Sequence, residues 1–222
     1  MPNSPLIIFD FDGTVALGDG PVLAYARAAA ASADEPERFL ARVDAGLRPA
    51  AAAAAAQPID AYDVIRVAAV EAGVAPDALS RAYLSSRALL GSAEAPVEAP
   101  VGLAAVAAAL AAECVLVTNA PAIRIAETLT ALGLGDAFTR IVTDAGKPAG
   151  LDRLLDEPGV AGRRVLAVGD IWRNDLEPAH RRGHDTALVG LWPDPTATPT
   201  FRAATLTDLL PRIEAWAAAS VS

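Results

Sequence analysis

Two aspartates separated by a single residue, Asp10 and Asp12, stand directly after a short apolar run and directly before a glycine. The run Leu6–Phe9 has the composition of a buried strand, and side chains at positions i and i+2 of an extended chain point the same way. Gly13 permits a sharp turn that brings backbone N–H groups close to a ligand. Two carboxylates held this close repel unless a cation or a proton neutralises them. The pattern therefore predicts a hard cation, Mg²⁺, with one carboxylate left free to act as a nucleophile.

Polar side chains follow three more apolar runs along the chain. They are Thr118 and Asn119 after Val115–Val117, Lys147 beyond Arg140–Val142, and Asp170, Asn174 and Asp175 after Val165–Val168. Ligands of parallel α/β sheets bind at the carboxyl ends of the strands. The four strand ends would therefore supply a nucleophile pair, a hydroxyl donor, an ammonium group and a second carboxylate pair. That set suits an oxyanion and a divalent cation.

Each of these groups also has a purely structural interpretation. The first two aspartates could form an acidic turn, and Thr118 and Asn119 could cap a helix after Pro121. The lysine could be a solvated surface side chain. Asp170 and Asp175 could be a turn residue and a helix N-cap. The order in which all of them follow strands favours the catalytic interpretation.

The elements that would position these residues alternate between strand and helix. Runs typical of strands buried on both faces lie at Leu6–Phe9, Val115–Val117, Arg140–Val142, Val165–Val168 and Ala187–Val189. Helical stretches separate the later runs, at Ala122–Leu132, Gly150–Leu155 and Asp175–Arg182. This alternation predicts an α/β fold with a Rossmann-like parallel sheet core and helices on both faces.

A helical block interrupts the alternation between residues 20 and 96. Its expected helices are Val22–Ala31, Pro36–Ala45, Ile59–Ala72 and Pro76–Leu90, punctuated by Pro49, Pro58 and Pro76. The stretch from Ser92 to Pro100 holds two prolines and is typical of a hinge. We therefore expect residues 1–19 and 97–222 to form the α/β core domain, and residues 20–96 to form an inserted α-helical cap domain.

Composition narrows the function classes. The chain has 222 residues, of which 53% are hydrophobic, so it can bury a sizeable core. A net charge of −9 argues against nucleic acid or anionic membrane as a partner.

Cys114, the single cysteine, lies in an apolar run and is expected to be a buried strand thiol. The runs of alanine, such as Ala50–Ala56, are too short to span a membrane, and no secretory signal is evident, so we expect a soluble cytoplasmic protein, a monomer or homodimer.

The motifs resemble those of haloacid dehalogenase-superfamily hydrolases of the subgroup with a helical cap, which includes phosphoglycolate phosphatases. Phe9–Thr14 is similar to the first motif, Asp-x-Asp-Gly-Thr, and Val117–Asn119 to the second, a strand ending in Thr or Ser. Lys147 with Pro148 is similar to the third, and Gly169–Asp175 to the fourth. The four motifs occur in the family's order across nearly the whole chain.

The resemblance implies catalytic roles. Asp10 would be the nucleophile that forms an aspartyl-phosphate, and Asp12 the general acid/base that protonates the leaving oxygen and then activates water. Thr118 would donate a hydrogen bond to the phosphoryl group. Lys147 would steady the nucleophile and the phosphate, and Asn119 is expected to contact the substrate with these two residues.

The resemblance also implies a Mg²⁺ site. Asp170 would hold the ion together with Asp10 and the backbone carbonyl of Asp12, while Asp175 and Asn174 would support these ligands. The acid/base residue Asp12 argues against carbon–halogen cleavage, because dehalogenases of this superfamily have no aspartate there. The absence of lysine from residues 20–96 argues against a phosphonatase-type Schiff base in the cap.

The sequence therefore predicts a Mg²⁺-dependent phosphatase for a small phosphorylated metabolite. The alternatives are a β-phosphoglucomutase-like phosphomutase and a catalytically silent binding or regulatory protein. Substrate specificity is expected to depend on the cap, whose candidate arginines are Arg27, Arg42, Arg48, Arg66, Arg81 and Arg87. Trp172 and Arg173 are candidates for the rim of the site. Leu17, where an aspartate is usual, and the short stretch from Thr143 to Lys147 depart from the family's pattern.

Overall fold

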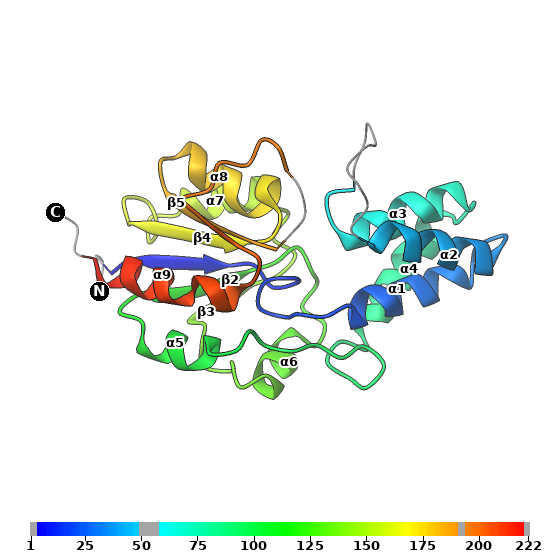
Figure 1. The fold of residues 1–222 in the computed structure, drawn as a ribbon, viewed down its shortest axis with the longest axis horizontal. Coiled ribbons are helices and arrows are strands. Elements are labelled where there is room, and N and C mark those ends of the chain that lie inside the picture. The colour runs from blue at the N-terminus through cyan, green and yellow to red at the C-terminus, as the bar shows by residue number, and fades with distance from the viewer. Residues whose placement is uncertain (1–3, 49–57, 191–193, 220–222) are drawn as a thin grey trace. The chain divides into compact units, whose positions relative to one another are not determined.

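The computed structural model describes residues 4–48, 58–190 and 194–219 (Figure 1). Pro49 and the alanine run at 50–56 lie outside these residues. The chain divides into two compact units. The α/β unit comprises Met1–Leu17, Glu98–Ala122 and Ala126–Ser222, and the helical unit comprises Gly18–Val97 and Ile123–Ile125.

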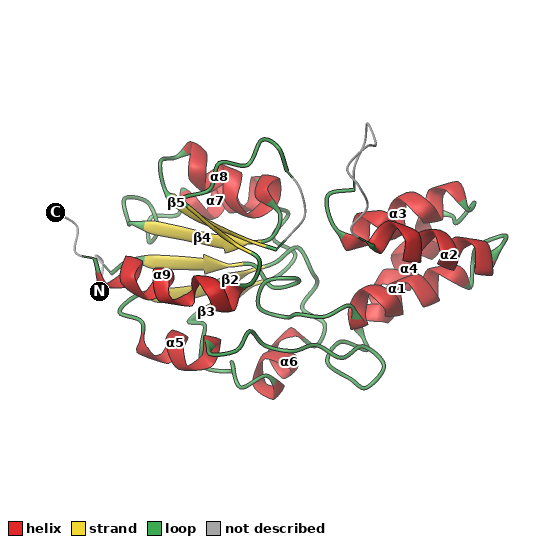
Figure 2. Ribbon diagram, viewed as in Figure 1, coloured by secondary structure: helices red, strands yellow, loops and turns green. Residues whose placement is uncertain are grey.

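Within the described residues of the α/β unit, six strands form one sheet in the order β3-β2-β1-β4-β5-β6 (Figure 2). They are β1 (Leu6–Phe9), β2 (Glu113–Val117), β3 (Arg140–Val142), β4 (Val165–Gly169), β5 (Asp185–Val189) and β6 (Phe201–Ala203). All neighbouring strands are parallel. Phe9 pairs with Leu116 of β2 and Val168 of β4, so the carboxyl ends of the three central strands lie nearly level.

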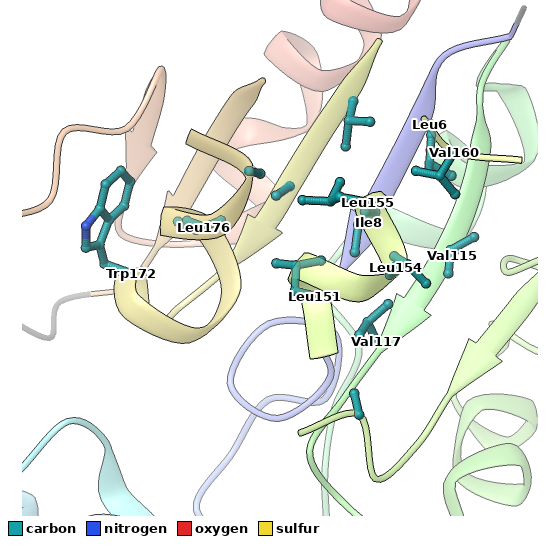
Figure 3. Close-up of a cluster of buried hydrophobic side chains, with 14 of the residues drawn as sticks. Leu6, Ile8, Val115, Val117, Leu151, Leu154, Leu155, Val160, Trp172 and Leu176 are labelled. Carbon is teal, nitrogen blue, oxygen red and sulfur yellow. The ribbon is translucent and has the colours of Figure 1, made fainter. Parts of the chain in front are cut away.

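One face of the sheet packs against α7 (Ala149–Leu155), the π-helical turn η1 (Trp172–Leu176) and α8 (Glu177–Arg181) (Figure 3). Side chains alternate between the two faces of a strand, so Leu6 and Ile8 of β1 point into this layer beside Leu151 and Leu155 of α7. All four are buried. This apolar layer holds α7 against the sheet, and Lys147 lies just before the first turn of α7.

The opposite side of the sheet carries α5 (Leu103–Ala109), α6 (Ile125–Ala131) and α9 (Leu206–Ala218) (Figure 1). Phe9 points away from the layer of Leu6 and Ile8, and its ring meets that of Phe138 edge to face, with the centroids 5.8 Å apart. The hydroxyl of Thr205 accepts the amide of Asp208 and so caps the start of α9. The predicted parallel α/β fold with helices on both faces is confirmed.

The helical unit contains α1 (Gly20–Ala30), α2 (Pro36–Leu47), α3 (Ala61–Glu71) and α4 (Pro76–Arg87). Proline occupies the first turn of α2 and α4, where its missing N–H costs nothing. Asp60 caps α3 by accepting the amide of Asp63 at 2.6 Å. The four helices share an apolar interior of their own, with Tyr25, Phe39 and Ile65 buried in it.

The stretch expected to be helical, Asp175–Arg182, is helical as far as Arg181, and it begins inside the π turn η1 and continues as α8. The expectation that Trp172 lies at the rim of the site was wrong, because its side chain is 4% exposed and belongs to the buried apolar cluster that includes residues of α7 and α8. The strand β6 was missed because its three residues carry too little apolar pattern. Among the described residues, no helix is both long enough and apolar enough to cross a membrane.

Candidate active site

The carboxyl ends of four adjacent strands bring the predicted site residues to one edge of the sheet. Asp10 follows β1, which lies between β2 and β4, and Asp170 follows β4. Thr118 follows β2, and Lys147 stands at the end of the loop after β3. The amide of Asp10 continues the ladder beyond β1 by donating to the carbonyl of Val168 at 2.9 Å. The position of Asp10 is therefore fixed by the sheet itself.

Gly13 turns the chain sharply away from the sheet. Its φ of +83° is strained for any residue with a side chain. A Cβ at this position would lie 2.5 Å from Oδ2 of Asp170, a distance that real Cβ atoms do not tolerate. The glycine thus serves both the turn after Asp10 and the close approach of the Asp170 carboxylate.

Lys147 joins two of the carboxylates. Its Nζ lies 2.6 Å from Oδ1 of Asp10 and 2.6 Å from Oδ1 of Asp175. The lysine side chain is only 4% exposed. Burial by itself would lower the pKa of Lys147, but the charges of Asp10 and Asp175 outweigh burial and raise that pKa above its usual range. The ammonium group is therefore charged at neutral pH and held rigidly beside the predicted nucleophile.

Asp175 is locked in place through both of its oxygens. Oδ1 accepts from Lys147, and Oδ2 accepts the amide of Ile171 at 3.0 Å. The carboxylate is fully buried, and burial raises its pKa to about 6, although the charge of Lys147 opposes this shift. Gly169 makes room for it, because a Cβ there would lie 2.4 Å from the Cβ of Asp175. Asn174 is half-buried in the same π turn, and its side chain takes no part in these hydrogen bonds.

The carboxylates of Asp10, Asp170 and Asp175 offer oxygens that lie within 4.8 Å of one another. Three carboxylates and one ammonium group leave an excess of negative charge, which a divalent cation would neutralise. Oxygen ligands suit a hard cation. The residues therefore fit Mg²⁺, with Asp10 and Asp170 as direct ligands. Asp175 fits a supporting role, because both of its oxygens already accept hydrogen bonds.

Thr118 and Asn119 follow β2 directly, but the first is buried and the second is exposed. Thr118 is 2% exposed, and its Oγ1 accepts the amide of Ala120 at 3.0 Å, which leaves its hydrogen available to an oxyanion. Asn119 is exposed, and its side chain bonds to the backbone of Lys147. Asp12 is half-buried in the turn, and its carboxylate is not part of the three-carboxylate cluster. The atom of Asp12 that is predicted to bind Mg²⁺ is the backbone carbonyl oxygen, so the carboxylate need not belong to the cluster.

A model of the haloacid dehalogenase-like hydrolases matches residues 5–183, which include every predicted site residue from Asp10 to Asp175. The chain belongs to this family. The resemblance seen in the motifs is thereby confirmed, and so is the prediction that the chain is a hydrolytic enzyme. Among curated proteins, none is similar enough in sequence to count as a relative.

Solved structures share the fold of this hydrolase over almost the whole chain. A predicted phosphoglycolate phosphatase from Haemophilus somnus is 18% identical, with a TM-score of 0.62 over 96% of this chain and 99% of that one. A protein assigned as a HAD-hydrolase, from Bacillus subtilis and bound to magnesium, is 16% identical, with a TM-score of 0.61 over 95% of this chain and 99% of that one. A protein assigned as a β-phosphoglucomutase, from Thermotoga maritima, is 15% identical, with a TM-score of 0.59 over 95% and 99%. At these identities the likeness concerns the fold alone.

The arginines of residues 20–96 differ in their exposure. Four form surface ion pairs inside the unit: Arg42 with Glu71, Arg48 with Asp44, Arg66 with Asp63 and Arg81 with Asp77. Arg27 is also at the surface, where it donates to the carbonyl of Glu94 at 2.9 Å. Arg87 differs, because it is fully buried and its Nη1 lies 3.4 Å from the hydroxyl of Tyr62. Arg38 is also exposed and forms an ion pair with Glu35.

Gly150 was missed as a residue that shapes the site. A Cβ at this position in α7 would lie 1.7 Å from the carbonyl oxygen of Ala145, in the loop that carries Lys147. The amide of Gly150 donates to the carbonyl of Gly146 at 2.8 Å. No local signal marks this glycine, since it stands in an ordinary helical stretch. Only the approach of the loop to α7 shows why a side chain is excluded there.

Proposed function

We propose that this hydrolase is a Mg²⁺-dependent phosphatase that acts on a small phosphorylated metabolite through an aspartyl-phosphate on Asp10. Its main support is the pair of 2.6 Å contacts that hold Lys147 between Asp10 and Asp175, with Asp170 beside them. Phosphoryl transfer depends on alignment and charge neutralisation more than on any other chemistry. A carboxylate fixed by a buried ammonium group and flanked by further carboxylates meets both needs.

The proposed reaction has two displacements. A carboxylate oxygen of Asp10 attacks phosphorus while the ester oxygen leaves with a proton from Asp12, which releases the alcohol. Asp12 then takes a proton from a water molecule that attacks the aspartyl-phosphate. Inorganic phosphate departs and the Asp10 carboxylate is restored. Lys147 and the hydroxyl of Thr118 would stabilise the phosphoryl oxygens during both steps.

Asp10, Asp170 and the backbone carbonyl of Asp12 would hold Mg²⁺, which would neutralise charge on the phosphoryl group and on the nucleophile. Gly13 supports this assignment by leaving room for the Asp170 carboxylate. Asp175 would keep Lys147 directed at Asp10 instead of binding the ion. Each carboxylate of the cluster thus has a distinct proposed task.

Two other chemistries of the family fit this chain less well. Asp12 provides an acid/base group that carbon–halogen cleavage does not need. Lys147 is the only lysine of the 222 residues and is already bound to Asp10 and Asp175. No lysine is therefore left for a Schiff base with a phosphonate substrate.

A phosphomutase remains the second candidate, because it would use the same residues and return the phosphate to a sugar. The shared fold with the Thermotoga protein favours neither activity over the other. A catalytically silent binding protein is the third candidate. The complete set of Asp10, Asp12, Lys147 and Asp170 argues against it, since binding alone would not require both a nucleophile and an acid/base group.

We further propose that residues 20–96 act as a cap that selects the substrate and limits the access of water. If the substrate carries a second anionic group, one arginine of this block would bind it. Replacing that arginine by alanine should raise KM for the true substrate and leave hydrolysis of p-nitrophenyl phosphate unchanged. Specificity would lie elsewhere if every such arginine could be replaced without effect.

Hydrolysis of p-nitrophenyl phosphate by the purified protein, with and without Mg²⁺, tests the proposed function. We expect activity that excess chelator abolishes and Mg²⁺ restores. Full activity in chelator would exclude the metal role, and inactivity toward all phosphate esters would exclude the phosphatase. A screen of phosphorylated metabolites would then identify the substrate. With sugar phosphates, release of inorganic phosphate indicates a phosphatase, whereas an isomeric sugar phosphate indicates a mutase.

A further inference from the structure

We propose that Asn119 is a positioning residue that fixes the loop bearing Lys147. Its side chain was expected from the sequence to contact the substrate, and we propose instead that it binds only this loop. Its importance for catalysis rests on the proposed function, but the contact itself does not. Oδ1 of Asn119 accepts the amide of Lys147 at 2.6 Å, and Nδ2 donates to the carbonyl of the same residue at 3.3 Å. One side-chain amide thus binds both backbone polar groups of one residue.

This pair of bonds continues the ladder between β2 and β3 beyond the ends of both strands. The amide of Thr118 donates to the carbonyl of Val142 at 2.9 Å, and the amide of Ala145 donates to the carbonyl of Thr118 at 3.0 Å. The amide of Asp144 donates to the carbonyl of Ala120 at 2.9 Å. Asn119 adds the last two bonds of the series, and they are the ones that reach Lys147.

The loop after β3 is short, and its backbone bonds to the β2 side end two residues before Lys147. Only four residues separate Val142 from Lys147, and two of them have positive φ, 48° at Asp144 and 67° at Gly146. β3 is a three-residue strand at the edge of the sheet. The two bonds from Asn119 extend the attachment of this short stretch as far as Lys147.

The position of the loop matters because of what Lys147 must reach. Its Nζ lies 2.6 Å from a carboxylate oxygen of Asp10 and of Asp175. A displacement of about 1 Å in a group that orients a reacting atom can cost about 100-fold in rate. Without Asn119 the backbone of Lys147 would lose both of its partners on the β2 side, and the nearest remaining bonds from that side would end at Asp144 and Ala145. We therefore expect a loss of rate and little change in substrate binding.

Two substitutions of Asn119 remove different numbers of its hydrogen bonds to Lys147. Asn119→Ala removes both bonds. Asn119→Asp keeps an oxygen for the shorter bond from the Lys147 amide and loses only the donor of the longer one. Thr130→Ala is the control, because Thr130 is an exposed residue of α6 whose hydroxyl bonds to its own helix, at the carbonyl of Ala126. A positioning role predicts partial rescue by aspartate and no effect of the control.

Kinetics on p-nitrophenyl phosphate and on the best substrate from the metabolite screen test the role. Asn119→Ala should lower kcat by about 10- to 100-fold on both substrates, with KM changed less than about 3-fold. Asn119→Asp should recover most of the lost rate. The proposal would be overturned if Asn119→Ala raised KM for one substrate and left kcat unchanged, since that pattern identifies a substrate contact. It would equally be overturned if the variant kept the full rate.

A second measurement does not depend on activity. Because Lys147 is the only lysine, protein labelled with ¹⁵N-lysine gives one backbone amide signal, that of Lys147 itself. Its exchange with solvent should be at least about 10-fold faster in Asn119→Ala than in the wild type or in Thr130→Ala. Equal protection in all three proteins would exclude the contact. If the wild type hydrolyses no phosphate ester, the proposed function fails, and the exchange rates still decide whether Asn119 holds Lys147.

Discussion

Lys147 and Asp175 form a buried ion pair, with 2.6 Å between Nζ and Oδ1 and side chains that are 4% and 3% exposed. The same ammonium group also bonds to Asp10, so one cation serves two carboxylates. Removing one member of such a group leaves an uncompensated charge away from water. Substitutions in and around this group should therefore change both the stability and the activity of the protein.

The pH dependence of stability should report Asp175. Its pKa is about 6 in the folded protein and 3.8 in the unfolded chain, because burial favours the protonated form. Between about pH 4 and pH 6 the folded state therefore binds more protons, and the stability contributed by this carboxyl falls as the pH rises. The metal-free wild type should lose on the order of 2 kcal/mol relative to Asp175→Asn across this window. Urea unfolding at a series of pH values measures the difference, which would stay flat if Asp175 were ionised throughout.

Asp10→Asn should abolish turnover, by at least about 1,000-fold, because the amide is not a nucleophile toward phosphorus. The side chain keeps its shape and an oxygen that can still accept from Lys147. The circular dichroism spectrum should therefore be unchanged and the protein should still unfold cooperatively. Appreciable activity in a pure preparation would show that another residue attacks the substrate.

Mg²⁺ should stabilise the folded protein through Asp170. A ligand that binds only the native state raises the unfolding temperature with its concentration. We expect this rise in the wild type and little or none in Asp170→Asn, measured by differential scanning fluorimetry over a Mg²⁺ titration. An equal rise in both proteins would place the ion elsewhere. In assays, Ca²⁺ should inhibit, because its looser coordination disturbs the in-line geometry.

Gly150→Ala should be harmful, although alanine normally favours a helix. The new Cβ would lie 1.7 Å from the carbonyl oxygen of Ala145, so α7 or the Lys147 loop must shift. We expect at least about a 10-fold loss of kcat and a destabilisation of about 1–3 kcal/mol. Gly159→Ala is the matched control, because a Cβ there meets nothing within 4 Å. Similar behaviour of the two variants in kinetics and urea unfolding would contradict the expected clash.

Arg87→Ala should destabilise the helical unit by about 2–4 kcal/mol, because a fully buried side chain is removed together with its bond to the Tyr62 hydroxyl. Arg81→Ala should change stability by less than about 0.5 kcal/mol, since both partners of its ion pair with Asp77 are 70% exposed. Chemical unfolding of the two variants makes the comparison. Equal effects would mean that burial of Arg87 contributes no stability.

Much of this protein was predictable because its signals are local. The run Leu6–Phe9 identified β1, and the two aspartates and the glycine after it identified the turn. Parallel strands bring their carboxyl ends to one edge of a sheet, so the order of motifs was enough to gather Asp10, Thr118, Lys147 and Asp170. Proline and glycine marked the ends of helices in the helical block. Residue type and spacing carried all of these predictions.

Tertiary structure alone decided which groups bond to one another. Asn119 and Lys147 are 28 residues apart, and only the register of β2 against β3 brings the amide of one to the backbone of the other. Trp172 proved to be a core residue, buried in the cluster that includes residues of α7 and α8, although its position in the motif indicated the rim of the site. The need for glycine at position 150 arises from an approach between a helix and a loop. Sequence pattern reports the environment each residue prefers, whereas contacts of this kind depend on the packing of distant segments.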